Sequence, residues 1–384
     1  MAVSLRSAFT EEIDDPQRAL QEILDLLKPD ELKKNSLGIL YCYADFVESG
    51  VTEYIARELP FDVIGMSSMA TAALGEKGSY RLTLAVLTSD DVRFTTVSTP
   101  DLMADSYQQA IGDAWREGSA RAEEPVRFAI GFLPFLGDIA GQEMLDAFDA
   151  ASGHTPLWGS IASGTDMTYS DCTTIHNGDI QQRSAAFALI EGAVEPEFAV
   201  TSIPERNIYE HKAIITRSHG CVLNEINDVP VLDYMHNLGI IFNEGDQTTI
   251  PLLIDYRDGS QPIALAMYAF LDDGGILCGG PVPQGALLSL GEIDPQGILE
   301  TAQESLDKLL ALTDRSGFLL LPCVTRFVML APNQEAEMAS VIERLEGVAS
   351  YTLGYSGGEL CPVRAEDGSW RNRFHNFTFT ACAL

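Results

Sequence analysis

A long internal repeat constrains the fold of this chain more than any single element does. An apolar strand at 128–135 precedes a helix whose apolar face is Met144, Ala147, Phe148 and Ala151, and a glycine turn follows at 157–160. Near the C-terminus, an apolar run at 318–330 precedes a helix with Met338, Val341, Ile342 and Leu345, and a glycine turn follows at 352–355. The helix faces are 194 residues apart, and Gly159 and Gly354 are 195 apart. Such a constant offset indicates two related copies of one structural unit.

The repeat extends toward the N-terminus of each copy. We match the strand 82–87 and the helix 102–115 with the strand 263–270 and the helix 298–310. The two halves then join near 202–205, which predicts lobes at 1–204 and 205–384. Strands occur both in hairpins and in strand–helix–strand units, so the expected fold class is α/β (mixed α+β), with mixed sheets and flanking helices.

Two local patterns near the N-terminus are informative. Asp15 is suited to cap a helix that begins at Pro16, with Leu20, Ile23, Leu24 and Leu27 on one face. The segment 80–87 alternates large apolar residues with Arg81, Thr83 and Ala85, which predicts a half-buried strand.

Three polar clusters interrupt apolar sequence near the C-terminus, at 323–326, 354–359 and 375–378. We expect the first to lie within a strand that carries Arg326, and the last to begin the final strand. Arginine is rarely buried unless it is paired. Polar side chains on neighbouring apolar strands are typical of a small-molecule site. The predicted ligand-binding residues are Cys323, Arg326, Tyr355, Ser356, Glu359, His375, Asn376 and Thr378.

These clusters carry a resemblance to a known family. The chain resembles FIST-domain proteins, whose C-terminal domain has a Cys-x-x-Arg strand, a Gly-Tyr-x-x-Gly-Glu turn and a His-Asn-x-Thr strand; here these stand in order at 323–326, 354–359 and 375–378. The first half is similar to the FIST N-terminal domain at 61–68, 156–163 and 175–178.

The resemblance implies an intracellular sensor of a small ligand, with amino acids as the usual proposal. The chain departs from the family after Ser67, where Met69-Ala70-Thr71-Ala72 replaces an Ala-Gly-Glu run. The two lobes occupy the whole length, so we expect any signal to pass through a separate signalling protein.

Each candidate residue has a plausible role and a plain structural alternative. The Arg326 guanidinium is suited to hold a ligand carboxylate, or it forms an internal ion pair with Glu359. Glu359 follows two glycines and is suited to accept from a ligand ammonium, or it faces solvent. His375 is more often structural than catalytic in such a position. Asn376 and Thr378 add polarity beside it, and Tyr355 and Ser356 offer hydroxyl groups.

Composition excludes several classes of function. The chain has 24 basic and 56 acidic residues, a net charge of -32, and no basic stripe, so we expect neither nucleic-acid binding nor insertion into a membrane. The N-terminus lacks a secretory apolar region, and seven cysteines without a Cys-x-x-Cys pair favour a reducing cytoplasm. No spacing predicts a metal site or a cofactor site.

Three hypotheses remain at this point. The first is a cytoplasmic sensor that binds an amino acid or a small acid. The second is an enzyme acting on a small carboxylated or amino substrate through Cys323 or His375, which requires these groups to lie within hydrogen-bond reach. The third is a scaffold whose polar clusters only pair with one another.

Overall fold

The structure is a computed structural model that describes residues 3–209, 212–240, 250–312 and 317–384. In this part of the chain, the core elements repeat three times in the same order: strand, helix, strand, helical segment, strand, hairpin, strand. The predicted offset of about 195 residues relates the second unit to the third, and a further copy precedes them. The fold is mixed α/β, with helices flanking mixed sheets.

The first unit contains β1 (Ser4–Thr10), α1 (Pro16–Leu27), β2 (Asn35–Cys42), α2 (Ala44–Glu48), α3 (Val51–Glu58), β3 (Asp62–Ser67), β4 (Thr71–Ala73), β5 (Glu76–Gly78) and β6 (Leu82–Ser89). The second contains β7 (Arg93–Ser98), α4 (Tyr107–Arg121), β8 (Val126–Leu133), α5 (Gly141–Ser152), β9 (Leu157–Ile161), β10 (Thr174–His176), β11 (Asp179–Gln181) and β12 (Ala186–Glu191). The third contains β13 (Glu197–Thr201), α7 (Pro295–Leu310), β22 (Gly317–Pro322), α8 (Val324–Met329), α9 (Ala336–Leu345), β23 (Ser350–Gly354), β24 (Gly358–Arg364), β25 (Trp370–His375) and β26 (Phe379–Ala383).

The third unit carries an inserted segment between β13 and α7. Its described elements, which we call the insert, form a separate antiparallel sheet with one helix beside it. They are β14 (Ala213–His219), β15 (Val222–Ile226), β16 (Val229–Pro230), α6 (Val231–Asn237), β17 (Leu252–Asp255), β18 (Ile263–Leu265), β19 (Met267–Phe270), β20 (Ile276–Cys278) and β21 (Leu287–Leu290). The predicted match of 82–87 with 263–270 is therefore wrong, because β6 closes the first unit whereas β18 and β19 belong to the insert. The match of the helices α4 and α7 agrees with the order of elements.

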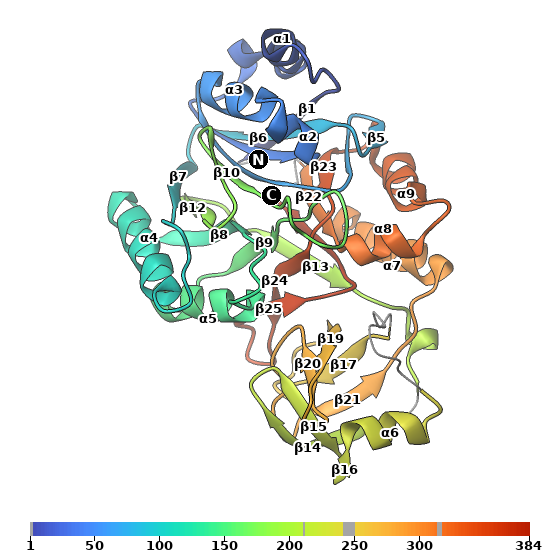
Figure 1. Cartoon of the computed structure of the whole chain (residues 1–384). Helices are drawn as coiled ribbons and strands as arrows, with labels where there is room; N and C mark the ends of the chain where they lie inside the picture. The colour runs from blue at the N-terminus through green and yellow to red at the C-terminus, as the bar shows by residue number, and fades with distance from the viewer. Residues whose placement is uncertain (1–2, 210–211, 241–249, 313–316) are drawn as a thin grey trace.

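The units exchange their hairpins in a cycle. The strand orders of the core sheets are β1-β6-β2-β3-β10-β11, β7-β12-β8-β9-β24-β25 and β13-β26-β22-β23-β4-β5. Each sheet thus takes strands from one unit and ends with the hairpin of another. In each sheet one pair is parallel, β2 with β3, β8 with β9 and β22 with β23. Figure 1 shows the consequence: helices α1 and α3, α4 and α5, and α7 to α9 lie on three sides of the strands, and the insert lies below them.

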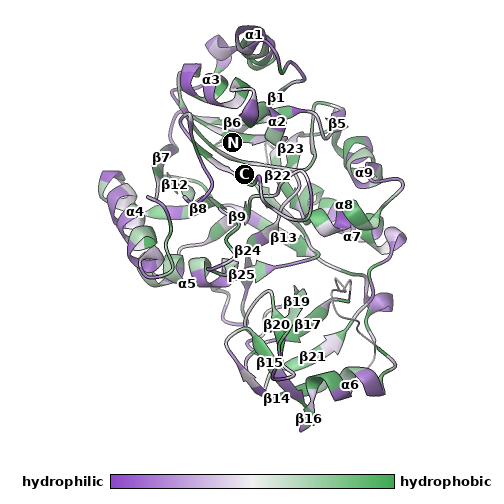
Figure 2. Ribbon diagram, viewed as in Figure 1, coloured by the Kyte–Doolittle hydropathy of each residue, from purple (hydrophilic) through white to green (hydrophobic). Residues whose placement is uncertain are grey.

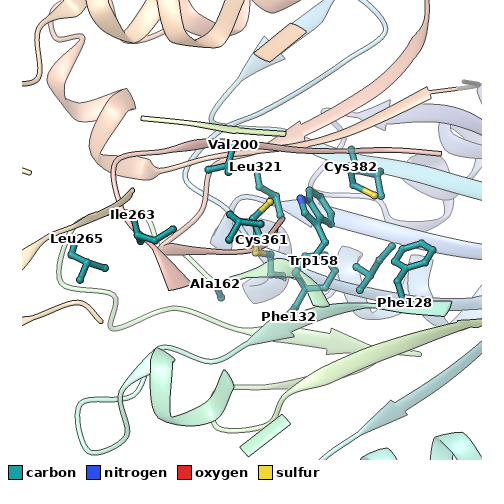
Figure 3. Packing of buried hydrophobic residues seen from close by; sticks show 14 of the residues in the cluster. Phe128, Phe132, Trp158, Ala162, Val200, Ile263, Leu265, Leu321, Cys361 and Cys382 are labelled. Carbon is teal, nitrogen blue, oxygen red and sulfur yellow. The ribbon is translucent and has the colours of Figure 1, made fainter. Parts of the chain in front are cut away.

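A shared apolar core fills the centre of these sheets. Its cluster of buried side chains draws on every unit and on the insert. Figure 3 shows Phe128, Phe132 and Trp158 of the second unit packed near Val200, Leu321, Cys361 and Cys382 of the third. In Figure 2 the inner strands are hydrophobic and the outer faces of the helices are hydrophilic. No described helix is long and apolar enough to cross a membrane.

The turns predicted at 157–160 and 352–355 are wrong, because these segments belong to strands β9 and β23, and Gly65 likewise lies within β3. A neighbouring strand passes close to Gly65 and to Gly159. A Cβ atom on Gly65 would lie 2.1 Å from the Leu40 carbonyl oxygen, and one on Gly159 would lie 1.8 Å from that of Gly131. The serines after these glycines then bond across units: Ser67 Oγ donates to the Ser163 carbonyl at 2.9 Å, and Ser163 Oγ donates to that of Tyr355 at 2.8 Å. These buried serines tie the units together.

Candidate functional site

Arg326 lies on a helix and not on a strand. Strand β22 ends at Pro322, Cys323 precedes the helix, and α8 carries Arg326 into the interior, where its side chain is 1% exposed. The apolar run 318–330 is continuous in sequence, so the predicted strand was wrong in its second half. The polar residue at this position marks the buried side of a short helix.

The Arg326 guanidinium is paired inside the protein. Its Nε and Nη2 donate to Glu337 Oε1 at 2.9 and 2.6 Å, and Glu337 is also fully buried. The predicted internal partner, Glu359, is therefore not the one observed. The Tyr355 hydroxyl donates to the other Glu337 oxygen at 3.0 Å, and burial together with this carboxylate raises the pKa of Tyr355 well above its usual value.

The remaining donors of Arg326 bond the backbone. Nη1 donates to the Ser202 carbonyl at 3.1 Å and to that of Phe377 at 3.3 Å, and Nη2 donates to that of Ile298 at 2.7 Å. Every nitrogen of the guanidinium thus has an acceptor. The side chain joins α8 and α9 to α7 and to the segment that follows β13.

Glu359 is the second residue of strand β24 and lies beside a different set of residues. Its Oε2 accepts from the Thr378 hydroxyl at 2.6 Å, whereas its Oε1 is buried without a hydrogen-bond partner. Burial raises the pKa of Glu359 to about 8, and the hydrogen bond from Thr378 opposes this rise. The carboxyl group is therefore largely protonated at neutral pH.

Two other sequence-predicted residues have different neighbours: Ser356 lies near the Glu359 carboxyl group, and Asn376 contacts the insert. Ser356 Oγ accepts from the Gly358 amide at 3.0 Å and lies 2.7 Å from Ser160 Oγ. Asn376 joins the core to the insert. Its backbone N–H donates to the Ala264 carbonyl at 2.9 Å, and its side-chain Oδ1 accepts from the Ala266 backbone N–H at 2.9 Å. Its Nδ2 donates to the Tyr268 hydroxyl at 3.1 Å.

Cys323 and His375 are both in uncharged forms at neutral pH. His375 ends strand β25 and does not begin the final strand as predicted; its Nε2 donates to the Cys361 carbonyl at 3.0 Å. Burial lowers the pKa of His375 to about 4. Burial raises the pKa of the Cys323 thiol well above its usual value, and nearby Glu359 adds to this rise. No hydrogen bond between these two side chains occurs in the described residues. The pair lacks the thiolate that nucleophilic catalysis requires.

A cleft of about 690 Å³ lies elsewhere, between the insert and the third unit. None of the eight sequence-predicted residues lines it. One wall comes from the end of β13, the segment after it and α7, and the other comes from β17, β21 and the loop before β18. Its described lining residues are Val200, Thr201, Ser202, Ile203, Glu205, Arg206, Ile208, Tyr209, Lys212, Leu253, Asp255, Gln261, Pro262, Leu287, Ser289, Glu304 and Lys308.

Hydrogen bonds hold the walls of this cleft. Thr201 Oγ1 donates to the Thr301 carbonyl of α7 at 2.8 Å, and Arg326 holds the Ser202 carbonyl from behind. Gln261 Nε2 crosses from the insert to the Val200 carbonyl at 3.2 Å. Farther along, Arg373 of β25 pairs with Asp258 of the insert at 2.7 Å. The ion pair of Arg326 is therefore one layer behind the cleft wall.

The charges that line the cleft are balanced in sign. Arg206, Lys212 and Lys308 supply positive charge, and Glu205, Asp255 and Glu304 supply negative charge. Arg206 pairs with Glu300 at 2.6 Å and Lys308 with Glu304 at 2.8 Å, both at exposed positions. Lys212 has no ion pair with a carboxylate of the described residues.

The spacing between elements indicates this cleft, although no sequence motif does. Residues 202–294 separate β13 from α7, whereas residues 99–106 separate β7 from α4. The corresponding place at the end of β7 holds a cavity of about 250 Å³. The extra segment builds the second wall of the larger cleft, so the difference in spacing between copies points to it.

Comparisons with known proteins agree with the motifs. A model of the FIST N domain matches residues 36–229, and a model of the FIST C domain matches residues 234–362. No curated protein sequence matches the chain.

Solved structures that match the chain include two of cyanuric acid hydrolase. One, described as evolutionary innovation by structural concatenation, is 9% identical over 99% of this chain and 98% of its own, with a TM-score of 0.33. Another, from A. caulinodans, is 11% identical; the match covers 100% of this chain and 99% of that one, with a TM-score of 0.39. Similarity this low carries no argument about chemistry. The family matches, in contrast, extend over most of the chain, and the chain belongs to the FIST-domain family.

Proposed function

We propose that this protein binds a small molecule, either an amino acid or a small acid, in the cleft between the insert and the third unit. The observation that carries the proposal is a cavity of about 690 Å³ whose walls combine apolar side chains with charges of both signs. Small-molecule sites occupy roughly 300–1,000 Å³ and use a few polar groups to orient the ligand. FIST domains are generally considered to be small-ligand sensors, which favours the same function.

The sequence-predicted residues have a supporting role in this proposal. Arg326 does not touch the ligand, but it holds the Ser202 carbonyl and α7, which both contribute to one wall. Asn376 holds the insert, which contributes the other wall. Glu359, with its unpartnered Oε1, Cys323, Ser356 and Thr378 stabilise the hairpin β24–β25 behind them.

Sensing requires the ligand to favour one arrangement of the walls over another. A ligand that contacts both β21 and α7 stabilises the arrangement in which the insert is closed on the core. We propose that a separate signalling protein reads this arrangement in the cytoplasm. None of the seven cysteines forms a disulfide bond, which supports a reducing compartment.

The enzymatic alternative lacks a supporting observation. Cys323 and His375 are buried, uncharged at neutral pH and not hydrogen-bonded to each other in the described residues. Binding without chemistry is the function that the geometry favours.

A thermal-shift screen tests the proposal. Ligand-free protein is screened with the twenty amino acids and with a panel of small carboxylic acids. A binder present at 100 times its dissociation constant adds about 2.7 kcal/mol to stability. Leu287→Trp, which fills the cleft from β21, should abolish this stabilisation, and Val348→Trp at an exposed turn should retain it. Stabilisation by none of the compounds, or equal stabilisation of both variants, contradicts the proposal.

A further inference from the structure

A second cavity of about 360 Å³ adjoins the cleft. The two share Val200 of β13, Gln261 of the insert and Lys308 of α7. The hydrogen bond from Gln261 Nε2 to the Val200 carbonyl lies at this boundary. The two cavities are therefore adjacent along β13.

The second cavity differs from the cleft in its chemistry. Its walls are mainly apolar and aromatic, with Phe198, Leu309, Leu312, Pro362, Val363 and Trp370. The Trp370 ring packs edge-on against Phe198, with ring centroids 5.1 Å apart, and the Arg364 guanidinium lies 4.1 Å from the Trp370 centroid. These contacts hold the indole in place, so the cavity offers a preformed apolar surface.

We infer that the natural ligand is amphipathic, with a charged head group in the cleft and an unbranched apolar tail of several methylene groups in the second cavity. This inference rests on the proposed function, because it assigns the head group to the same cleft. A free amino acid with a short side chain contacts only the cleft and leaves the aromatic walls uncovered. An alkyl tail that passes Val200 covers them and gains affinity from their desolvation.

The carboxyl and ammonium groups of the head have separate partners in the cleft. Lys212 lacks an ion pair with a described carboxylate and is suited to a ligand carboxylate. Asp255 on β17 and Glu205 after β13 are suited to an ammonium group. Lys308 is at the boundary, so its aliphatic stem lies along the path of the tail while its ammonium pairs with Glu304 at the surface.

A homologous series of ligands tests the inference without any mutation. The probes are linear 2-aminoalkanoates from alanine to 2-aminododecanoate, and the matching linear alkanoates, all below their micellar concentrations. Calorimetric titration should give one site, with affinity rising about two- to fourfold per added methylene and then levelling off. The amino series should bind more tightly than the alkanoates if both head charges are used.

Two variants locate the tail. Trp370→Ala should flatten the dependence on chain length, whereas Trp115→Ala, a matched change on the distant helix α4, should retain it. Leu287→Trp should abolish binding of every member. An affinity that does not change with chain length, an unchanged slope in Trp370→Ala, or binding of long members to Leu287→Trp each overturns the inference. The proposed function fails separately, if no member of either series binds.

Discussion

Arg326 and Glu337 form a fully buried ion pair in which two guanidinium nitrogens donate to one carboxylate oxygen, at 2.9 and 2.6 Å. The pair is internal to the third unit and sits behind the cleft wall. Its geometry explains why an arginine is tolerated there, because all of its nitrogens have acceptors.

Removing one partner of this pair should be costly. Arg326→Ala removes the donors that serve Glu337 Oε1 and the Ser202 and Phe377 carbonyls, so we expect a loss of about 3–5 kcal/mol in the free energy of unfolding, measured by urea denaturation. Arg344→Ala breaks the exposed pair with Asp307 and should change little. The double variant Arg326→Met with Glu337→Leu should recover part of the loss. Equal stability of Arg326→Ala and Arg344→Ala would show that the pair between Arg326 and Glu337 is not shielded from solvent.

The raised pKa of Glu359 predicts a dependence of stability on pH. The carboxyl group titrates near 4.5 when unfolded and near 8 when folded, so the folded state binds more protons between these values. Its contribution to stability is therefore complete below pH 4.5 and is lost as pH rises to about 8. The slope is at most about 1.4 kcal/mol per pH unit.

The variant Glu359→Gln isolates this contribution. Its stability should fall less than that of the wild type between pH 5 and pH 8, so the difference between the two grows with pH in urea titrations. His375 acts in the opposite sense below pH 6.5 and is present in both proteins, so it cancels. If the curves of stability against pH are parallel for the two proteins, the pKa of Glu359 is not raised in the folded state.

Gly159 should not tolerate a methyl group. A Cβ atom there meets the Gly131 carbonyl at 1.8 Å, so Gly159→Ala must separate β8 from β9. We expect a loss of about 3 kcal/mol or more, read from the midpoint of chemical denaturation. Gly137→Ala is the matched control, since no atom lies within 4 Å of its added methyl group. Similar midpoints for both variants would contradict the close approach of these strands.

Asn376 should decide how firmly the insert is held. Asn376→Ala removes the acceptor for the Ala266 amide, at a cost of about 1–3 kcal/mol. Hydrogen exchange at 264–266 should become faster, while exchange in β8 and β9 should not change. Asn376→Asp retains an oxygen for this amide and should restore much of the protection. Faster exchange throughout the core would instead mean that Asn376 stabilises the whole fold.

Local features were predictable from sequence where neighbours in the chain decide them. Asp15 caps α1 by accepting from the Gln17 and Arg18 amides, and Pro16 begins the helix, as its pattern predicted. The repeat was visible because each copy needs its apolar helix face and its strand glycine at the same spacing. The predicted eight-residue site is a different case: that these residues contact a ligand stays a prediction, and none of them lines the cleft that we propose as the binding site.

Burial on two faces could not be predicted from alternation. Strand β6 was expected to be half-buried, yet it is buried throughout, because it lies between β1 and β2 with helices on one face and the shared core on the other. Small polar residues such as Thr83 fit there as well as on a solvent face. The pattern of a single strand contains no information on the layers that cover it.

The sequence by itself determined the repeat, the start of α1 and the family, because each depends on residue types at short or regular spacing. Tertiary structure alone decided that Arg326 pairs with Glu337 and not Glu359, that units exchange hairpins, and that a cleft opens between the insert and α7. These outcomes depend on which segments, distant in sequence, come into contact. Several carboxylates and several edge strands in one chain offer equivalent local chemistry, and only the packing of the whole chain selects among them.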